Sequence, residues 1–245
     1  LARHARADHA SATTFLHAEA DADLPALLAR GPAPHAGRVH EWLSDADAAD
    51  APPALSIFIA LARAACAGPA PRPGALAWIG APVHPLPTAI AQGAGRAALE
   101  RSVFVRAESD DDRLWAIDLA LRSRACALVI ADGAGIDMSA SRRLQLAAEA
   151  GRTHCLLARP GRERTALSAA AVRWLVAPAP TPHHGRTGWS VHLLRRKGVR
   201  PASGADGPWR VEIDRATGAV ALVADLADGH RAAGVGEASR RVVAG

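Results

Sequence analysis

Residues 125–160, ACALVIADGAGIDMSASRRLQLAAEAGRTHCLLARP, decide the fold. Residues 126–131 form a short apolar run that ends at Asp132, which predicts a strand buried on both faces of a parallel sheet. A second buried strand is predicted over residues 154–158 and ends just before Arg159. Ligands of parallel sheets bind beyond the carboxyl ends of the strands, so we expect Asp132 and Arg159 to point toward that edge.

The segment between these strands has the pattern of one amphipathic helix of about three turns. Ser139 or Ser141 is expected to cap its start, and Gly151 lies where a C-terminal cap is expected. The residues expected on its buried face are Leu144, Ala147 and Ala148. Strand, helix and strand together predict a right-handed parallel crossover.

The rest of the chain continues this alternation. Strands are predicted over residues 37–43, 75–79 and 102–106, and helices over residues 53–67, 86–100 and 113–124, the last capped by Ser109 with Asp112 three residues on. Further along, a strand is predicted over residues 171–177, a loop over 181–188, a strand over 189–196, and a hairpin that pairs 209–214 with 220–224. The order predicts an α/β fold, a mostly parallel sheet flanked by helices with an antiparallel C-terminal hairpin.

Length and composition are typical of one sizeable domain. The chain has 245 residues, of which 49% are hydrophobic, and this is enough for a real core. We expect a mobile lead-in over residues 1–36 with one helix near 23–30, a domain over residues 37–225, and a flexible basic tail over residues 226–245. The net charge of +5 and a sequence pI near 10.3 favour an anionic partner such as nucleic acid.

Cysteine usage and hydropathy indicate the compartment. Cys66, Cys126 and Cys155 are isolated in apolar segments, which favours buried free thiols in a reducing environment. No apolar run approaches the ~20 residues that a membrane span needs. We therefore expect a cytoplasmic protein with no membrane contact. His183 and His184 have no neighbouring ligands in the sequence, so no metal site is expected there.

The segment between the first strand and the first long helix is where a nucleotide-binding α/β protein carries its phosphate loop. Residues 44–53 contain no glycine and no lysine, and they include three aspartates, Asp45, Asp47 and Asp50. Glycines and a lysine are what allow such a loop to hold an anion, whereas carboxylates repel it. Lys197 is the single lysine of the chain, so no other copy of the motif exists.

The order of the elements and several of their sequences resemble the RecA recombinase core. They look more specifically like the ImuA family, RecA-like proteins sometimes labelled SulA-like and encoded beside an ImuB polymerase subunit. The resemblance covers roughly residues 35–225. Its most specific parts are LWAIDLALRSRACALVIADG (114–133), SRRLQLAAEAG (141–151) and LLRRKG (193–198). It implies a RecA-like core.

The resemblance makes Asp132 the match to the Walker B aspartate, which holds the magnesium of ATP in recombinases. Residues 44–53 match the Walker A loop in place and depart from its pattern entirely. Pro82 stands about where recombinases place the glutamate that activates water, and no lysine lies between Arg210 and Gly218 to reach ATP across a filament interface. We therefore expect a pseudo-ATPase with no cofactor, in which Asp132 is a relic.

The resemblance also implies a function. A member of this family is expected to act by binding, as an accessory factor of the SOS response that supports error-prone translesion DNA synthesis and DNA repair. The implied partners are an ImuB-type polymerase subunit, a DnaE-type error-prone polymerase, RecA and single-stranded DNA. Its expected location is the cytoplasm, with association to the nucleoid on DNA damage.

Arginines near the expected binding edge are the candidates for DNA contact, because guanidinium groups suit phosphates. The candidates are Arg142, Arg143, Arg159, Arg162 and Arg164, together with Arg195, Arg196 and Lys197 on the flanking strand. The recombinase DNA-binding loops correspond to residues 133–140 and 160–168, both short here. Trp189 and Trp209 could stack on bases, although their alternating strand positions favour packing.

Two other functions stay open at this point. The first is a RecA-class, ATP-dependent DNA-binding protein that uses an unusual phosphate loop. The second is a SulA-like inhibitor of cell division, which would bind an FtsZ-type tubulin homologue and no polymerase subunit. The sequence contains no nucleophile motif or spaced carboxylate pair that would indicate another enzyme class.

Overall fold

The computed structural model describes residues 24–30, 37–45, 54–197 and 208–223. Its α-helices are α2 (Leu24–Arg30), α3 (Leu55–Ala67), α4 (Pro87–Gly93), α5 (Arg96–Glu100), α6 (Asp110–Arg122) and α7 (Met138–Gly151), with short 3-10 turns η1 (Ala81–Val83) and η2 (Gly161–Glu163). Its strands are β1 (Val39–Ser44), β2 (Ala75–Ile79), β3 (Ser102–Val105), β4 (Cys126–Asp132), β5 (His154–Pro160), β6 (Val172–Ala179), β7 (Arg186–Arg196), β8 (Trp209–Asp214) and β9 (Val220–Val223).

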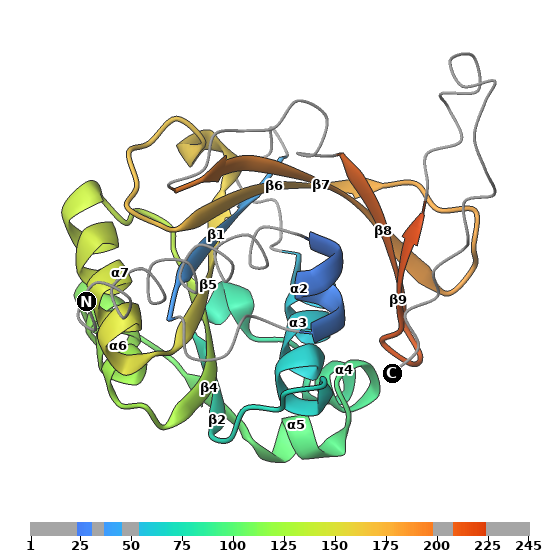
Figure 1. Cartoon of the computed structure of the whole chain (residues 1–245), viewed down its shortest axis with the longest axis horizontal. Helices are drawn as coiled ribbons and strands as arrows, with labels where there is room; N and C mark the ends of the chain where they lie inside the picture. The colour runs from blue at the N-terminus through green and yellow to red at the C-terminus, as the bar shows by residue number, and fades with distance from the viewer. Residues whose placement is uncertain (1–23, 31–36, 46–53, 198–207, 224–245) are drawn as a thin grey trace, which may run out of the picture.

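The strands form one mixed sheet in the order β3-β2-β4-β5-β1-β6-β7-β8-β9. Neighbours from β3 to β6 pair in parallel, whereas β6 to β9 pair in antiparallel fashion. Figure 1 shows helices on both faces of the parallel part, with α6 and α7 on one side and α2 to α5 on the other. The predicted α/β architecture is therefore confirmed, and it is consistent with a RecA-like core.

The central strand β4 shows why its sequence is apolar from Cys126 to Ala131. Along β4, Leu128 and Ile130 belong to the core beneath α3, whereas Val129 and Ala131 belong to the core beneath α6 and α7. A strand that is covered by helices on both faces has no solvent side, so the alternation of polar and apolar residues disappears. The expected buried face of α7, Leu144, Ala147 and Ala148, is also confirmed.

The antiparallel strands form a curved flank that arches over α2 and α3 (Figure 1). The indole Nε1 of Trp189 donates a hydrogen bond of 2.8 Å to Ser56 Oγ at the start of α3. At the tip of the β8–β9 hairpin, Gly218 lies directly against Gly93 at the end of α4, where a built Cβ would come within 2.0 Å of the Gly93 oxygen. The flank thus packs on the same core as α3.

Four predicted details were wrong, each for a local reason. The cap of α7 is Asp137, whose Oδ1 accepts from the Ala140 amide at 2.7 Å, and not Ser139 or Ser141. Its C-terminal cap is Arg152, in the left-handed region at φ 54°, and not Gly151. The helix predicted over 86–100 is divided where Gly95 has φ 92°. Strand β7 begins within the predicted loop 181–188.

The proposed lead-in and tail mostly lie outside the described residues, except that α2 occupies the place of the helix expected near 23–30. Among the three cysteines, Cys155 is buried as expected, whereas Cys66 and Cys126 are half-buried; all three are free thiols. Within the described part of the chain, we find no helix with both the length and the apolar character that a bilayer crossing demands.

Candidate functional site at the carboxyl edge of the sheet

Asp132 lies at the carboxyl end of β4, at the edge where the sequence placed it, and it is 8% exposed. Its Oδ2 accepts a hydrogen bond of 3.0 Å from Arg113 Nη1, which is also an ion pair. Its Oδ1 accepts a hydrogen bond of 3.0 Å from the backbone amide of Ala134. Both carboxylate oxygens are therefore engaged by donors of the chain itself.

Arg113, in the first turn of α6, is the partner that sequence reasoning missed. Its Nη1 also lies 3.0 Å from Asp110 Oδ1, and its Nη2 donates a hydrogen bond of 2.6 Å to the backbone oxygen of Ala134. The guanidinium thus ties the start of α6 to the loop that follows β4. Gly80, at φ 95°, allows this close arrangement, because a Cβ there would lie 2.8 Å from the Asp132 Cβ.

This arrangement does not suit a magnesium ion at Asp132. A Mg²⁺ ligand needs an open oxygen, and here the guanidinium of Arg113 holds the place of the cation. Pro82 lines the same small cavity as Asp132 and contributes no carboxylate to it. Residues 46–53, most of the Walker A counterpart, lie outside the described residues. Among the described residues no group of three or more His, Cys, Asp or Glu could hold a metal.

Arg159 reaches the carboxyl edge as predicted, but its side chain is only 1% exposed. Its Nη1 donates a hydrogen bond of 2.8 Å to Glu41 Oε1, and its Nε donates one of 2.8 Å to Glu163 Oε2. Burial lowers the pKa of this guanidinium, yet the carboxylates of Glu41 and Glu163 outweigh burial and raise it. The prediction that Arg159 contacts DNA is therefore corrected, because its guanidinium is buried and its N–H groups are hydrogen-bonded within the fold.

Glu41, in the middle of β1, organises this buried cluster. It is fully buried, and besides Arg159 it accepts 2.7 Å hydrogen bonds from Arg173 Nε and from Ser168 Oγ. One signal in the sequence could have found it. A glutamate inside an apolar strand, VHEWL, requires a buried cation, because an isolated charge is not tolerated there. The sequence does not say which arginine is that cation.

The two loops that follow β4 and β5 are tied to one another. The amide of Gly135 donates a hydrogen bond of 3.0 Å to Glu163 Oε1, and Arg159 Nη2 donates one of 2.8 Å to the backbone oxygen of Ile136. On the far side of the cluster, the Arg173 guanidinium donates to the backbone oxygens of Glu163 and Arg164. The loop after β5 is thus held against the sheet by charged groups at several points.

The remaining arginine candidates fall into two groups. Arg142 and Arg143 are exposed on α7, where Arg143 Nε lies 3.6 Å from Asp118 on α6, and Arg162 and Arg164 are exposed on the loop after β5. The other group, Arg195, Arg196 and Lys197, ends β7 beside the start of β6, at the opposite end of the parallel strands. The candidate arginines and Lys197 therefore do not form one continuous patch.

Arg195 is further constrained by its neighbours. Its Nη2 donates to the backbone oxygens of Ser168, at 2.8 Å, and Ala170, at 2.9 Å. Burial first, and then the charge of Arg173, lower the pKa of this guanidinium. Its hydrogen bonds anchor the end of the loop that carries Arg162 and Arg164.

The tryptophan candidates and His183 have structural roles. Trp189 is bonded to Ser56, and Trp209 packs edge-on against Trp174 with ring centroids 5.9 Å apart, which confirms packing as their use. His183 Nδ1 lies 2.9 Å from Glu212 Oε2, in a cluster on the antiparallel flank. Both tryptophans therefore contribute to the core around α3.

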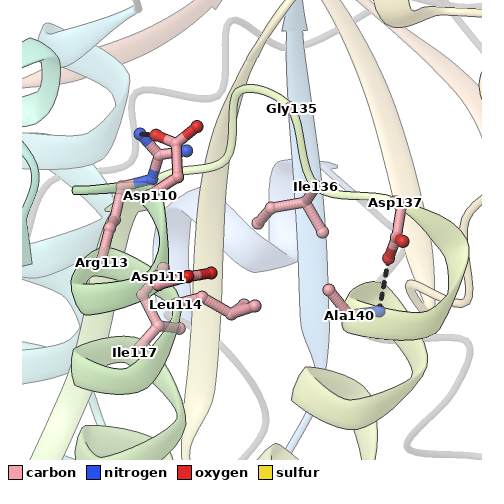
Figure 2. A pocket seen from close by; sticks show the side chains of 9 residues that line it. All are labelled: Asp110, Asp111, Arg113, Leu114, Ile117, Gly135, Ile136, Asp137 and Ala140. Carbon is pink, nitrogen blue, oxygen red and sulfur yellow. Dashed lines mark hydrogen bonds and ion pairs between the residues drawn. The ribbon is translucent and has the colours of Figure 1, made fainter.

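A cavity of about 210 Å³ opens beside Arg113, between the start of α6 and the loop before α7 (Figure 2). Asp111 and Leu114 point into it from α6, and Ile136 faces them from the loop. Carboxylates surround an apolar floor. The carboxyl edge is therefore acidic next to α6, and its exposed arginines lie beyond, on α7 and the loop after β5.

Comparisons with known proteins give one consistent likeness. No family model matches the chain. Two curated proteins, each called Protein ImuA and from two strains of Caulobacter vibrioides, are 34% identical to it over 159 residues. The match covers 58% of this chain and 62% of each relative, so the chain spans less than two thirds of their length.

Proposed function

From the ImuA-family assignment that this 34% identity supports, we propose that the chain is a non-catalytic accessory factor of damage-induced mutagenesis. The likeness supports a role in that system. The mechanism proposed for it is binding: the protein helps to bring an ImuB-type polymerase subunit to damaged DNA during error-prone translesion synthesis. On this proposal it neither hydrolyses nor requires ATP.

The Asp132–Arg113 ion pair is the observation that supports a non-catalytic role. Phosphoryl transfer requires a phosphate cradle, a metal and a positioned nucleophile together. Asp132, the match to the metal-binding aspartate, accepts a hydrogen bond of 3.0 Å from Arg113 at its Oδ2 and one from the Ala134 amide at its Oδ1. Releasing it would leave the largely buried guanidinium of Arg113 paired with the exposed Asp110 instead, which is costly.

The sequence of residues 44–53 supports the same conclusion independently. With no glycine, no lysine and three aspartates, this segment lacks the groups that neutralise a triphosphate. The acidic groups beside α6, which include Asp110 and Asp111, add further negative charge at the same edge. A nucleotide would therefore meet repulsion where a recombinase offers attraction.

The surface proposed for DNA is the exposed group Arg142, Arg143, Arg162 and Arg164. Because η2 and the residues after it are held by Glu41, Arg159 and Arg173, the loop arginines are presented from a fixed backbone. A loop whose backbone is already held loses less entropy when its arginines bind phosphates. Arg159 is not part of this surface.

Two calorimetric titrations of the full chain test the proposal. With magnesium present, we expect no heat from ATP up to millimolar concentration, and we expect Asp132→Asn to change nothing. With the ImuB-type subunit encoded in the same genome, we expect binding with a dissociation constant at or below about 1 μM, or about −8 kcal/mol.

Micromolar binding of ATP, reduced in Asp132→Asn, would contradict the non-catalytic reading and favour the ATP-dependent alternative. Failure of the folded chain to bind the ImuB-type subunit would overturn the accessory role. Circular dichroism of each protein before titration shows that it is folded, so a silent titration is informative.

A further inference from the structure

The cavity between α6 and the loop before α7 is an apolar groove with a charged rim. Leu114 and Ile117 on α6 form its floor, together with Ile136 from the loop (Figure 2). Ile117 is fully buried, whereas Leu114 is half-buried and faces the open space. The function proposed above uses the rim only as negative charge that repels a nucleotide, and it does not use the floor.

The rim consists of carboxylates on both sides. Asp110 and Asp111 lie on the α6 side and Asp137 on the α7 side. The one guanidinium that lines the groove, Arg113, is already within 3.0 Å of both Asp110 and Asp132. The open side of the groove therefore carries negative charge, although the chain as a whole has a net charge of +5.

The two helix N-termini at the groove partly offset this charge but do not reverse it. Each helix contributes roughly +0.5 of an elementary charge at its start, about +1 for the pair. The carboxylates of Asp110, Asp111, Asp132 and Asp137 contribute about −4, and the guanidinium of Arg113 contributes about +1, which leaves about −3. The groove therefore attracts cations.

Both helices also carry exposed apolar side chains close in sequence to the residues that line the groove. Trp115, next to Leu114, is 64% exposed, and Leu119 one turn further along α6 is 51% exposed. Met138, next to Asp137 at the start of α7, is 43% exposed. A free amine or inorganic cation would leave these side chains in water, whereas a peptide with an apolar face would cover them.

We infer that this groove docks a basic, amphipathic segment of a partner protein, which places a Lys or Arg side chain between the carboxylates. The aliphatic stem of such a side chain packs on Leu114 and Ile136, and its cationic end meets Asp111 and Asp137. The flanking apolar residues of the segment cover Trp115 and Met138. This inference stands apart from the proposed function, because it needs neither DNA nor an ImuB-type partner.

Charge complementarity argues against the terminal segments of the chain itself as the occupant. Residues 1–23 contain more acidic than basic residues. Residues 224–245 contain three of each, so the tail over residues 226–245 has a net charge of only +1, with Arg240 and Arg241 as its basic pair. Neither segment therefore offers a strong positive charge. A separate basic partner complements the groove better.

The test uses a short fluorescein-labelled helical peptide of Leu and Lys, and a second peptide in which Glu replaces each Lys. We expect the basic peptide to bind the full chain and the acidic peptide not to bind. The double variant with Asp111→Asn and Asp137→Asn is expected to weaken binding about tenfold, which is about 1.4 kcal/mol. Asparagine at position 137 keeps a helix-capping oxygen, so α7 remains intact.

Glu100→Gln is the control for lost negative charge: it removes one carboxylate away from the groove, in the exposed pair with Arg96 on α5, whereas the double variant removes two. It is expected to leave peptide binding unchanged. In ¹H–¹⁵N spectra, the amides of Gly135 and Ile136 and the Trp115 indole should shift on adding the basic peptide. Equal losses in the control and the double variant, no shift at these groups, or no binding at all would each overturn the inference.

Two further outcomes would identify a different occupant and would also overturn it. One is concentration-dependent self-association of the wild-type chain that is lost in Asp111→Asn, which would show a second copy in the groove. The other is movement of the Gly135 and Ile136 resonances, without peptide, when Arg240 and Arg241 are both replaced by Ala, which would show the chain's own terminus there.

Discussion

At the scale of single residues, Glu41 is a side chain that joins several distant segments of the chain. It is fully buried and is bonded to Arg159, Arg173 and Ser168. Glu41→Gln removes the negative charge and leaves two buried guanidinium groups without it. We expect the free energy of unfolding to fall by about 3–5 kcal/mol, as when one partner of a buried ion pair is lost. Urea unfolding followed by circular dichroism measures this.

The matched control for this prediction is again an exposed pair. Arg96 and Glu100 lie 2.9 Å apart with side chains 88% and 62% exposed, so Glu100→Gln should change the free energy of unfolding by less than about 1 kcal/mol. If both variants unfold at the same urea concentration, the cluster around Glu41 does not stabilise the fold. An unchanged slope of the transition would show that the compactness of the unfolded state is unaffected.

At the scale of elements, the end of α7 gives Gly151 a role other than the C-terminal cap that was expected of it. A Cβ at Gly151 would lie 1.8 Å from the backbone oxygen of Leu121, so this glycine is needed where α7 meets α6. Gly151→Ala must push the two helices apart. We expect it to lower the free energy of unfolding by about 1–3 kcal/mol, the usual range for overpacking, in thermal or urea melts.

The neighbouring substitution should have the opposite sign. Arg152 holds the left-handed cap of α7 at φ 54°, a conformation that favours glycine. Arg152→Gly is therefore expected to raise the free energy of unfolding or leave it unchanged, within about 1 kcal/mol. The backbone oxygen of Arg152, which accepts from Arg72, is kept. A loss of stability as large as that of Gly151→Ala would contradict this division of roles.

The elements themselves were largely predictable because their signals are local. The strand over residues 75–79 follows from its apolar run, and the Ser109 cap of α6 follows from a serine placed before acidic residues, with Ser109 Oγ accepting from the Asp112 amide at 3.1 Å. The site was less predictable. Whether Asp132 faces a metal or Arg113, and whether Arg159 faces solvent or Glu41, depends on segments far apart in the sequence, and no local pattern encodes that choice.

At the scale of the whole molecule, charged groups stabilise the two halves of the sheet differently. The parallel half uses buried ion pairs around Glu41 and Asp132. The antiparallel flank uses carboxylates on β8. Hydrogen bonds from Thr217 lower the pKa of Asp214 at the β8–β9 turn, where the Asp214 carboxylate is exposed to solvent. Glu212 is the buried member, bonded to Thr181 Oγ1 at 2.6 Å and to Arg186 Nη1 at 3.1 Å.

This difference predicts how stability depends on pH. Burial by itself would raise the pKa of Glu212, but the hydrogen bonds from Thr181 and Arg186 and the charge of His183 outweigh it, so the pKa lies below its ordinary value of 4.5. A carboxyl group whose pKa is lowered by folding stabilises the folded state fully above its unfolded pKa. That stabilisation is lost as the pH falls through the folded pKa.

We therefore expect the free energy of unfolding to decrease when the pH is lowered from about 5 toward 3, and to decrease less steeply in Glu212→Gln. Urea unfolding at a series of pH values measures both slopes, with Glu100→Gln as the control that keeps the wild-type slope. A Glu212→Gln variant with the wild-type slope would place the acid sensitivity elsewhere. The antiparallel flank arches over α3 (Figure 1), and Trp189 of this flank is bonded to Ser56 at the start of α3. Unfolding of the flank on acidification should therefore expose Trp189, and the change in tryptophan fluorescence should follow the same pH dependence.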